Sequence, residues 1–185
     1  MNQPARQGHE YSPRVLILGH GEHGKDVTAE LLRDHHGLSF QSSSRAAFEE
    51  AIWPVIGLEY LPLAYQNENA AVPDPIWNAA KEACFEDRRN RRVEWRDLIS
   101  AFNTPDKARL VKLVLAQNDM YVGLRCDQEY AASRHLFDLI IWVHRPSYPV
   151  DSSMRIEFDP SCMHSVVNAG SKDLLRSQLR KIVCP

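Results

Sequence analysis

The stretch Val15–Asp26, VLILGHGEHGKD, decides the fold of this chain. It begins with apolar, partly β-branched residues that run directly into glycine, which predicts a short buried parallel strand. The part that follows, Gly19–Asp26, reads G-x-x-x-x-G-K and leads into Lys25–Asp34, whose apolar spacing predicts a helix. A strand, a glycine-rich turn and a helix in this order are the context of a phosphate-binding loop.

The chemistry of phosphate binding explains the residue types in this loop. Glycines let backbone N–H groups turn toward phosphate oxygens, a helix N-terminus adds positive potential, and a lysine supplies a mobile charge for the β- and γ-phosphates. The chain holds only eight glycines, and three of them lie here. We predict that ATP is bound by Gly19, His20, Gly21, Glu22, His23, Gly24, Lys25, Asp26 and Val27. The alternative is a glycine-rich turn with a surface lysine, in which both histidines are simply exposed to solvent.

One position departs from the usual pattern of such loops. The residue after the lysine usually offers a hydroxyl to magnesium, and here it is Asp26. A carboxylate beside anionic phosphates is tolerable when a cation lies between them. We therefore expect Mg²⁺ to be held by Asp26, directly or through water, or by the hydroxyl of Thr28.

Strands and helices alternate along the rest of the chain. Apolar segments predict further strands at 38–40, 119–123, 138–143 and 165–168. Periodic segments predict helices at 45–53, 76–102, 105–117, 128–135 and 172–183. We expect Pro54 to end the first of these helices, and Thr104 with Pro105 to begin the third. The alternation predicts a three-layer α/β domain with a five-stranded parallel sheet over residues 13–185, after a flexible tail at 1–12.

Composition excludes several classes of protein. Apolar residues make up 44% and charged residues 25% of the 185 residues, and the formal net charge is −2. These values are ordinary for a globular protein and give no overall basic field for nucleic acid or membranes. The chain has no apolar run of about 18 residues, and its polar start lacks the core of a signal peptide. We expect a cytoplasmic protein without a membrane partner, whose cysteines are reduced.

Charged residues follow the ends of several predicted strands, where groups for phosphoryl transfer would lie in an open parallel sheet. Such positions are held by Arg45, Arg125 and Arg145, while Arg155 lies in the irregular segment beyond them. We expect these arginines to neutralise the transferring phosphate or bind its acceptor; each is alternatively a solvated side chain.

Acidic residues follow the third predicted strand as well. Asp127 and Glu129 are candidates for metal binding or for accepting the proton of an attacking hydroxyl. Their alternative role is to stabilise the N-terminus of the helix that follows. We take Asp127 as the base and Lys25 and Arg125 as its catalytic partners.

The run Arg88–Arg92, RRNRR, is the only dense basic stretch. Acidic residues surround it, and Asp87 and Arg91 have the i,i+4 spacing of a helical ion pair. The favoured interpretation is therefore a salt-bridged solvent face. The alternative is contact with a nucleic-acid backbone, with Trp77 or Trp95 near enough to stack on a base.

Three segments resemble phage-type P-loop nucleotide kinases: Gly19–Asp26 in the form GxGxxGKD, the turn Ser42–Arg45, and Tyr121–Glu129, YVGLRCDQE. The family includes deoxynucleoside monophosphate kinases and related kinases that phosphorylate 5-hydroxymethyluracil already in phage DNA, a step toward hypermodified thymidine. The resemblance covers roughly residues 14–183. It implies a nucleoside monophosphate kinase-like fold, ATP-phosphate binding by Gly19–Lys25, acceptor binding near Arg45, and an Arg125 that faces the transferred group.

Two departures separate the chain from kinases of free nucleotides. The segment His144–Asp159 is broken by prolines and holds only Arg145 and Arg155, so an arginine-rich lid helix is missing, as is an Asp-Arg pair after the third strand. A lid that encloses a free nucleotide would obstruct a polymer, so a shortened lid favours an acceptor in DNA.

The resulting functional prediction is an ATP- and Mg²⁺-dependent kinase that acts on a deoxypyrimidine, best the hydroxymethyl group of 5-hydroxymethyluracil in DNA, in the host cytoplasm if the chain is phage-encoded. One alternative is a kinase of free deoxynucleoside monophosphates. Another is a P-loop module that binds nucleotide without a dedicated acceptor. The oligomeric state stays open, with a homodimer among the options.

Overall fold

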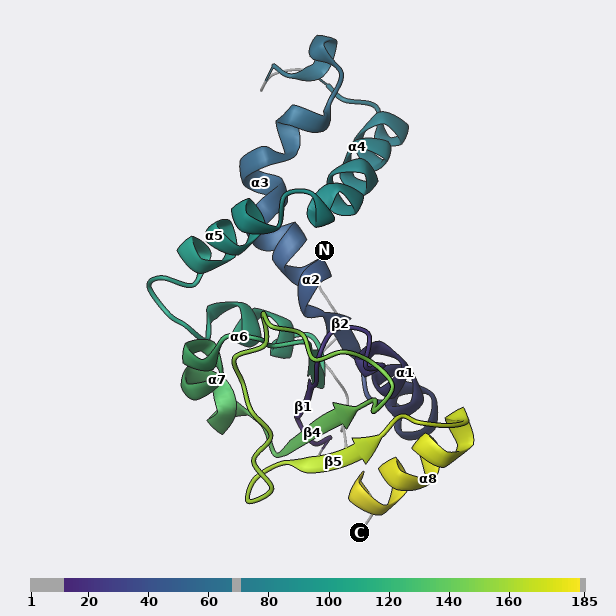
Figure 1. The fold of residues 1–185 in the computed structure, drawn as a ribbon. Helices are drawn as coiled ribbons and strands as arrows, with labels where there is room; N and C mark the ends of the chain where they lie inside the picture. The colour runs from purple at the N-terminus through teal and green to yellow at the C-terminus, as the bar shows by residue number, and fades with distance from the viewer. Residues whose placement is uncertain (1–11, 68–70, 184–185) are drawn as a thin grey trace. The chain divides into compact units, whose positions relative to one another are not determined.

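The structure, a computed structural model, describes residues 12–67 and 71–183 (Figure 1). They form two compact units: one contains the chain up to Ser42 and from Val111 onward, and the other spans Ser43–Leu110. Sequence analysis expected one domain over 13–185. Apart from Ser12, the predicted flexible tail lies outside the described residues.

The first unit contains a sheet of five parallel strands in the order β2-β3-β1-β4-β5. Their bounds are Val15–Leu18 for β1, Phe40–Ser42 for β2, Met120–Val122 for β3, Leu139–His144 for β4 and His164–Val167 for β5. The five-stranded parallel sheet is confirmed, although β2 begins at Phe40 rather than at the expected residue 38. Because β1 lies between β3 and β4, the segment that follows β1 emerges at a topological switch point, where ligands bind in open α/β sheets.

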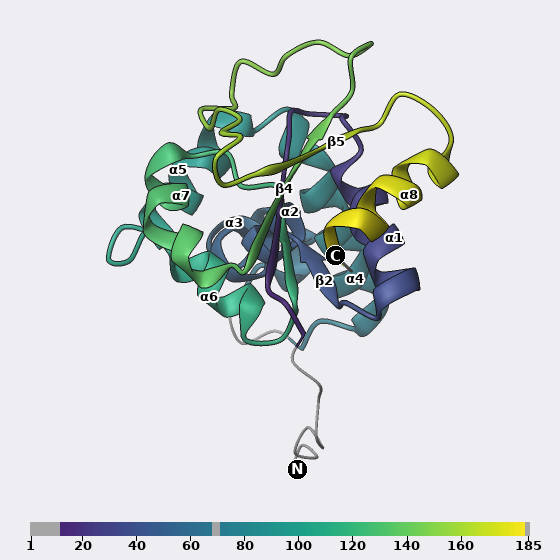
Figure 2. The same cartoon turned by 90° about the horizontal axis from the view of Figure 1, so that it is seen from below.

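Helices cover both faces of this sheet. They are α1 (Lys25–His36), α7 (Asp127–Ser133), α8 (Lys172–Val183) and α6 (Arg109–Leu115), which begins in the other unit. Figure 2 shows α1 and α8 on one face and α7 on the other. Alternate strand residues such as Ile17 and Ile141 pack with Leu32 and Leu179 in one apolar core. No helix of the described residues is both long and apolar enough to cross a membrane.

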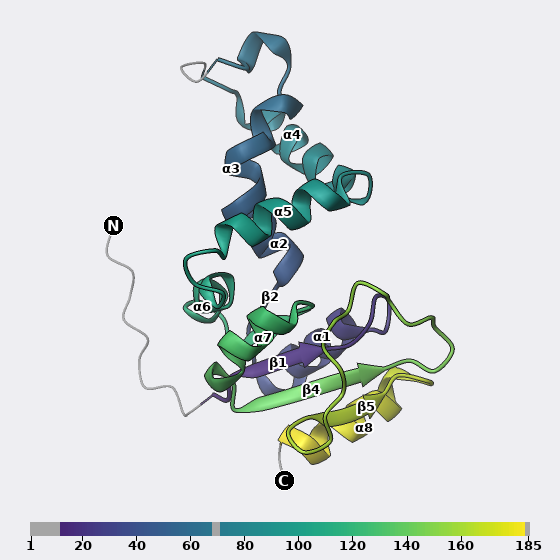
Figure 3. The same cartoon turned by 60° about the vertical axis from the view of Figure 1, so that its left-hand side comes forward.

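The second unit is helical (Figure 3). Its main elements are α2 (Ser43–Ala47), a π-helical segment (Phe48–Ile52), α3 (Trp53–Ile56), α4 (Asp74–Glu86) and α5 (Arg92–Phe102), with 3₁₀ turns at Gly57–Tyr60, Leu63–Tyr65 and Asp87–Arg89. Aromatic rings form its core. Phe48 stacks on Trp95 with 5.9 Å between ring centroids, and Phe85 packs edge-on against Phe48 at 5.4 Å.

Two helix predictions in this unit were wrong. The single helix expected over 76–102 is interrupted after Glu86, because the backbone and side chain of Asp87 both accept hydrogen bonds from Asn90 and close a turn. Such local side-chain bonds compete with the helical ladder. Pro54 does not end its helix, since it lies in the first turn of α3. Backbone N–H groups in a first turn have no partner within the helix, so proline is tolerated there.

The start of the helix expected over 105–117 was also wrong. The hydroxyl of Thr104 donates backward to the carbonyl of Ser100 at 2.9 Å instead of capping the next helix. The carboxylate of Asp106 accepts from the N–H of Ala108 at 2.9 Å, and regular helix begins at Arg109.

Candidate phosphate-binding site

The loop between β1 and α1 has a backbone that requires glycine. Gly24 has φ 92°, and a Cβ placed there would lie 2.1 Å from Nδ2 of Asn168. Gly19 has φ 142°, and its Cβ would lie 2.4 Å from the carbonyl oxygen of Val143. Glu22 takes a left-handed conformation, φ 61°, despite its side chain. Strain of this kind persists where the surrounding structure holds it, commonly at ligand sites.

Lys25 folds back over the loop that precedes it. Its ammonium group donates to the carbonyl oxygens of Gly19 at 2.9 Å and His20 at 2.6 Å. Burial of the ammonium lowers the pKa of Lys25 to about 8, with a further lowering from the nearby charge of Arg125. Two positive charges at a partly buried site favour the arrival of an anion.

The N-terminus of α1 opens into the same loop. Gly24 caps this helix without a side-chain hydrogen bond, and the described residues supply no acceptor for the backbone N–H groups of Lys25, Asp26 and Val27. Free N–H groups at the positive end of a helix dipole form an anion site. The loop therefore offers backbone donors, a helix terminus and an ammonium group to one ligand.

The segment between β4 and β5, residues 145–163, lies against this loop through two histidines. The backbone N–H of Arg145 donates to Nδ1 of His23, and that of Asp151 donates to Nδ1 of His20, both at 3.2 Å. Each bond needs an unprotonated Nδ1. The pKa of His20 is lowered, first by burial and then by the nearby His23, which favours that state. Asn168, after β5, adds a bond from Nδ2 to the carbonyl of His23 at 3.1 Å.

Asp151 connects the 145–163 segment to Arg125. Its Oδ2 accepts from Nη1 of Arg125 at 2.6 Å, and its Oδ1 accepts from the backbone and hydroxyl of Ser153. Burial alone would raise the pKa of Asp151, but the bonds from Ser153 and the charge of Arg125 outweigh it and lower the pKa to about 2. A Cβ on Gly21 would lie 3.0 Å from Oδ2, so this carboxylate touches the loop between β1 and α1.

The structure brings several predicted residues to the loop. Arg125 reaches it through Asp151, and Nη1 of Arg145 lies 3.4 Å from the carbonyl of Glu22. Arg155 contributes its backbone N–H to the carbonyl of Arg125 at 3.1 Å, while its side chain is exposed. His23 is 1% exposed, so the alternative of a solvent-exposed ring was wrong for this residue.

Two other predicted residues have different surroundings. Asp127 begins α7 and is exposed, with the thiol of Cys126 3.7 Å from its carboxylate. Arg45 belongs to the helical unit, where its guanidinium pairs with Glu82 at 3.1 Å and lies 3.8 Å above the ring of Phe85.

Asp26 and Thr28 are the two predicted ligands for magnesium. The hydroxyl of Thr28 is fully buried and donates to the carbonyl of Gly24 at 3.0 Å, whereas Asp26 is exposed in the first turn of α1. In the part of the chain that the structure describes, no three His, Cys, Asp or Glu residues form a metal cluster. Magnesium at phosphates commonly takes only one or two protein carboxylates and completes its shell with phosphate and water. Asp26 fits that requirement.

Sequence reasoning missed Asp151 and Asn168. Asn168 directly follows β5, so the strand-end rule that selected the arginines would have found it too. Asp151 stands in the motif Asp-Ser-Ser, which signals a turn but not a contact with a loop more than a hundred residues away in sequence.

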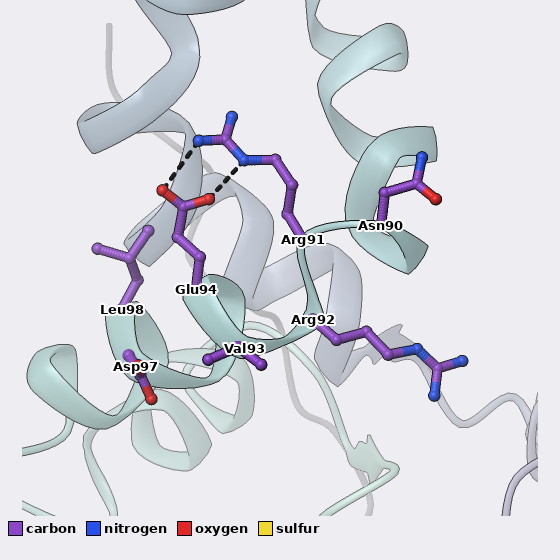
Figure 4. A pocket seen from close by; sticks show the side chains of 7 residues that line it. All are labelled: Asn90, Arg91, Arg92, Val93, Glu94, Asp97 and Leu98. Carbon is purple, nitrogen blue, oxygen red and sulfur yellow. Dashed lines mark hydrogen bonds and ion pairs between the residues drawn. The ribbon is translucent and has the colours of Figure 1, made fainter.

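A hollow of about 630 Å³ lies elsewhere, in the helical unit (Figure 4). It is lined by Asn90, Arg91, Arg92, Val93, Glu94, Asp97 and Leu98. Both nitrogens on one side of the Arg91 guanidinium bond Glu94, and Nη1 also bonds Glu59 at 2.9 Å. Arg91 is thus neutralised, which agrees with the salt-bridged interpretation of this run.

No protein-family model and no curated protein matches this sequence. Seven chains of solved structures match it in fold comparison. One is the unliganded crystal structure of a sugar kinase from Janibacter sp. HTCC2649, with 12% identity, a TM-score of 0.44, and coverage of 94% of this chain and 95% of that chain. A likeness of this degree carries no argument about activity.

Proposed function

We propose that this chain is an ATP-dependent phosphotransferase whose phosphate loop is Gly19–Val27. The observation that carries the proposal is the position of Lys25, whose ammonium is held against the loop by two carbonyl oxygens at 2.9 and 2.6 Å. Its charge stands beside the free N–H groups that begin α1. A triphosphate supplies the anionic oxygens that these donors lack.

The chemical step assigns roles to the neighbouring residues. An acceptor oxygen forms a bond to the γ-phosphorus as the bond to the β–γ bridging oxygen breaks and ADP leaves. Lys25 and Arg125 neutralise the charge that develops on the transferred group. Asp127 accepts the proton of a hydroxyl acceptor, and Asp26 contributes the carboxylate for a magnesium ion that shields the phosphates.

For the acceptor, we propose the hydroxymethyl group of 5-hydroxymethyluracil in DNA. The resemblance to phage kinases suggests this class, and the 145–163 segment supports it, because the described residues there form no lid helix. A site without such a lid leaves room for a polymer. Arg145 and Arg155 in the segment, and Arg45 in the helical unit, are the proposed acceptor contacts.

The test follows transfer from γ-labelled ATP to three acceptors: mixed free deoxynucleoside monophosphates, ordinary DNA, and DNA that contains 5-hydroxymethyluracil. We expect label in the modified DNA alone, with none for Lys25→Ala. Label only in free diphosphates would identify a nucleotide kinase instead. Release of labelled phosphate without transfer would identify a nucleotide-hydrolysing module.

Substitution of Asp127 distinguishes a kinase of a hydroxyl group from a kinase of free monophosphates. A hydroxyl acceptor benefits from a base, whereas a phosphate acceptor is already nucleophilic. Asp127→Asn should therefore lower transfer to the hydroxymethyl group by about a hundredfold or more, while binding of ATP stays unchanged. A small loss on the DNA substrate would reject Asp127 as the base.

A further inference from the structure

The carboxylate of Asp151 lies against the loop that follows β1. It is close enough to Gly21 that a Cβ there would approach Oδ2 to 3.0 Å. Asp151 pairs with Arg125 at 2.6 Å, and its negative charge also favours the protonated form of Lys25. The cations that would hold a phosphate are therefore already shared with one carboxylate of the same chain.

We propose that Asp151 is an internal stand-in for phosphate, and that a phosphate-bearing ligand must displace it together with the 145–163 segment. This regulation of the site rests on the proposed function only in taking the loop to bind phosphate. A carboxylate and a phosphate repel each other when they share the same cations. Ligand entry and the Asp151 contact are consequently competing states of one site.

The bonds that hold Asp151 are weak enough to be exchanged. The side chains of Arg125 and Asp151 are 48% and 23% exposed, and ion pairs with such access to water contribute little to stability. A phosphate carries more charge than a carboxylate and suits the planar guanidinium of Arg125 well. Further ties of the segment are the bonds from the backbone N–H groups of Asp151 and Arg145 to His20 and His23. The backbone N–H of Arg155 also bonds the carbonyl of Arg125.

The same segment contains a matched control. Oδ1 of Asp159 accepts from the backbone N–H and hydroxyl of Ser161, as Oδ1 of Asp151 does from Ser153. No interaction of Asp159 with Lys25 or Arg125 is found among the described residues. Asp159→Asn therefore removes the same charge and alters the same kind of turn without touching the phosphate loop.

The experiment measures binding of inorganic triphosphate, without a metal ion, by titration calorimetry. Asp151→Asn should bind about two- to fivefold more tightly than the wild type, since an exposed ion pair contributes about that factor. Asp159→Asn should bind like the wild type. Asp151→Ala serves as a second variant and should also bind more tightly.

Three outcomes would overturn the inference. Equal or weaker binding by the Asp151 variants would show that the carboxylate does not compete with the ligand. Weaker binding of MgATP alone would make Asp151 a metal ligand instead. Equal tightening by Asp159→Asn would make the effect one of net charge.

A second readout follows the segment itself. In the wild type, triphosphate should speed hydrogen exchange at the amides of Asp151 and Arg155, which bond His20 and Arg125 in the ligand-free state. Unchanged or slower exchange would contradict displacement. Failure of every form to bind triphosphate would reject the phosphate site and the proposed function together. Tightening by Asp151→Asn without any phosphoryl transfer would leave this inference standing and reject only the kinase.

Discussion

Two regions of this chain offer cations to a phosphate, the run Arg88–Arg92 and the loop after β1, and they differ in structure. The run Arg88–Arg92 has the higher density of cations, yet Arg91 is bonded to Glu94, Glu59 and the hydroxyl of Tyr60. At the phosphate loop there are fewer cations. Lys25 there is held by two carbonyl oxygens, and Arg125 pairs with the carboxylate of Asp151.

The two regions differ in the groups that surround their cations. In the helical unit, Arg88 lies 4.2 Å over the ring of Phe85 and bonds the carbonyl of that residue, so its role is structural. At the loop, Lys25 is the first residue of α1, a helix without a side-chain cap, and the charge of Arg125 is near enough to lower the pKa of Lys25. A ligand site therefore depends on donors that fold toward one point, not on the number of basic residues in a segment.

Removal of the loop lysine should have the largest effect. Lys25→Ala should weaken triphosphate binding by about 2 kcal/mol or more, because it leaves the bound phosphate without its partly buried partner. Titration calorimetry measures this. The control is Arg89→Ala, which removes one exposed charge from the other basic region and should change nothing. Comparable losses in both variants would abolish the distinction between the two regions.

The loop backbone should also be sensitive to substitution. Gly24→Ala should lower the free energy of unfolding by about 2–3 kcal/mol, since it combines a left-handed φ with a contact at 2.1 Å. Gly37→Ala is matched, with φ 70° and nothing within 4 Å of its Cβ, and should lose only about 1 kcal/mol. Urea unfolding measures the free energy of unfolding of both variants. Equal losses would mean that the close contact of Gly24 with Asn168 does not contribute to stability.

The charge of Lys25 should make binding depend on pH. Because its pKa in the free protein is lowered to about 8, triphosphate affinity should fall as pH rises above that value, by at most about tenfold per pH unit. Lys25→Arg stays charged and should flatten this dependence. For stability the sign is opposite: between about 8 and 10.5 the unfolded chain binds more protons, so stability rises with pH there. A pH-independent affinity in the wild type would contradict the lowered pKa.

The smallest effect is expected in the helical unit. Arg91→Ala should lower the free energy of unfolding by about 1 kcal/mol through loss of its bonds to Glu94, Glu59 and Tyr60. Triphosphate affinity should remain that of the wild type. Arg92→Ala, which removes an exposed arginine from the same run, is the control for charge and should leave stability unchanged. A fall in affinity for Arg91→Ala would place ligand at the basic run after all.

Local pattern was enough to predict part of this molecule. The strand β1, the glycine-rich turn and α1 follow from a contiguous stretch in which each residue's conformation depends on near neighbours. The parallel sheet followed from the alternation of strands and helices. Arg125 was selected because all parallel strands end at one edge of the sheet, and its role at the site stays a prediction.

Other features depend on contacts that no local pattern reveals. Asp151 reaches His20 and Arg125 only after the sheet has formed, and its own segment reads as an ordinary turn. The break after Glu86 depends on Asp87 and Asn90, whose side-chain bond competes with helical hydrogen bonding. Propensity alone favoured continuation of the helix.

Phosphate binding at the loop after β1 can be observed directly in a titration of the ¹⁵N-labelled protein with inorganic triphosphate, followed by amide chemical shifts. We expect the largest changes at Gly21, Gly24 and Lys25, with the amides of Arg92 and Val93 unmoved. Changes centred on Arg92 and Val93, with a silent loop, would contradict the account.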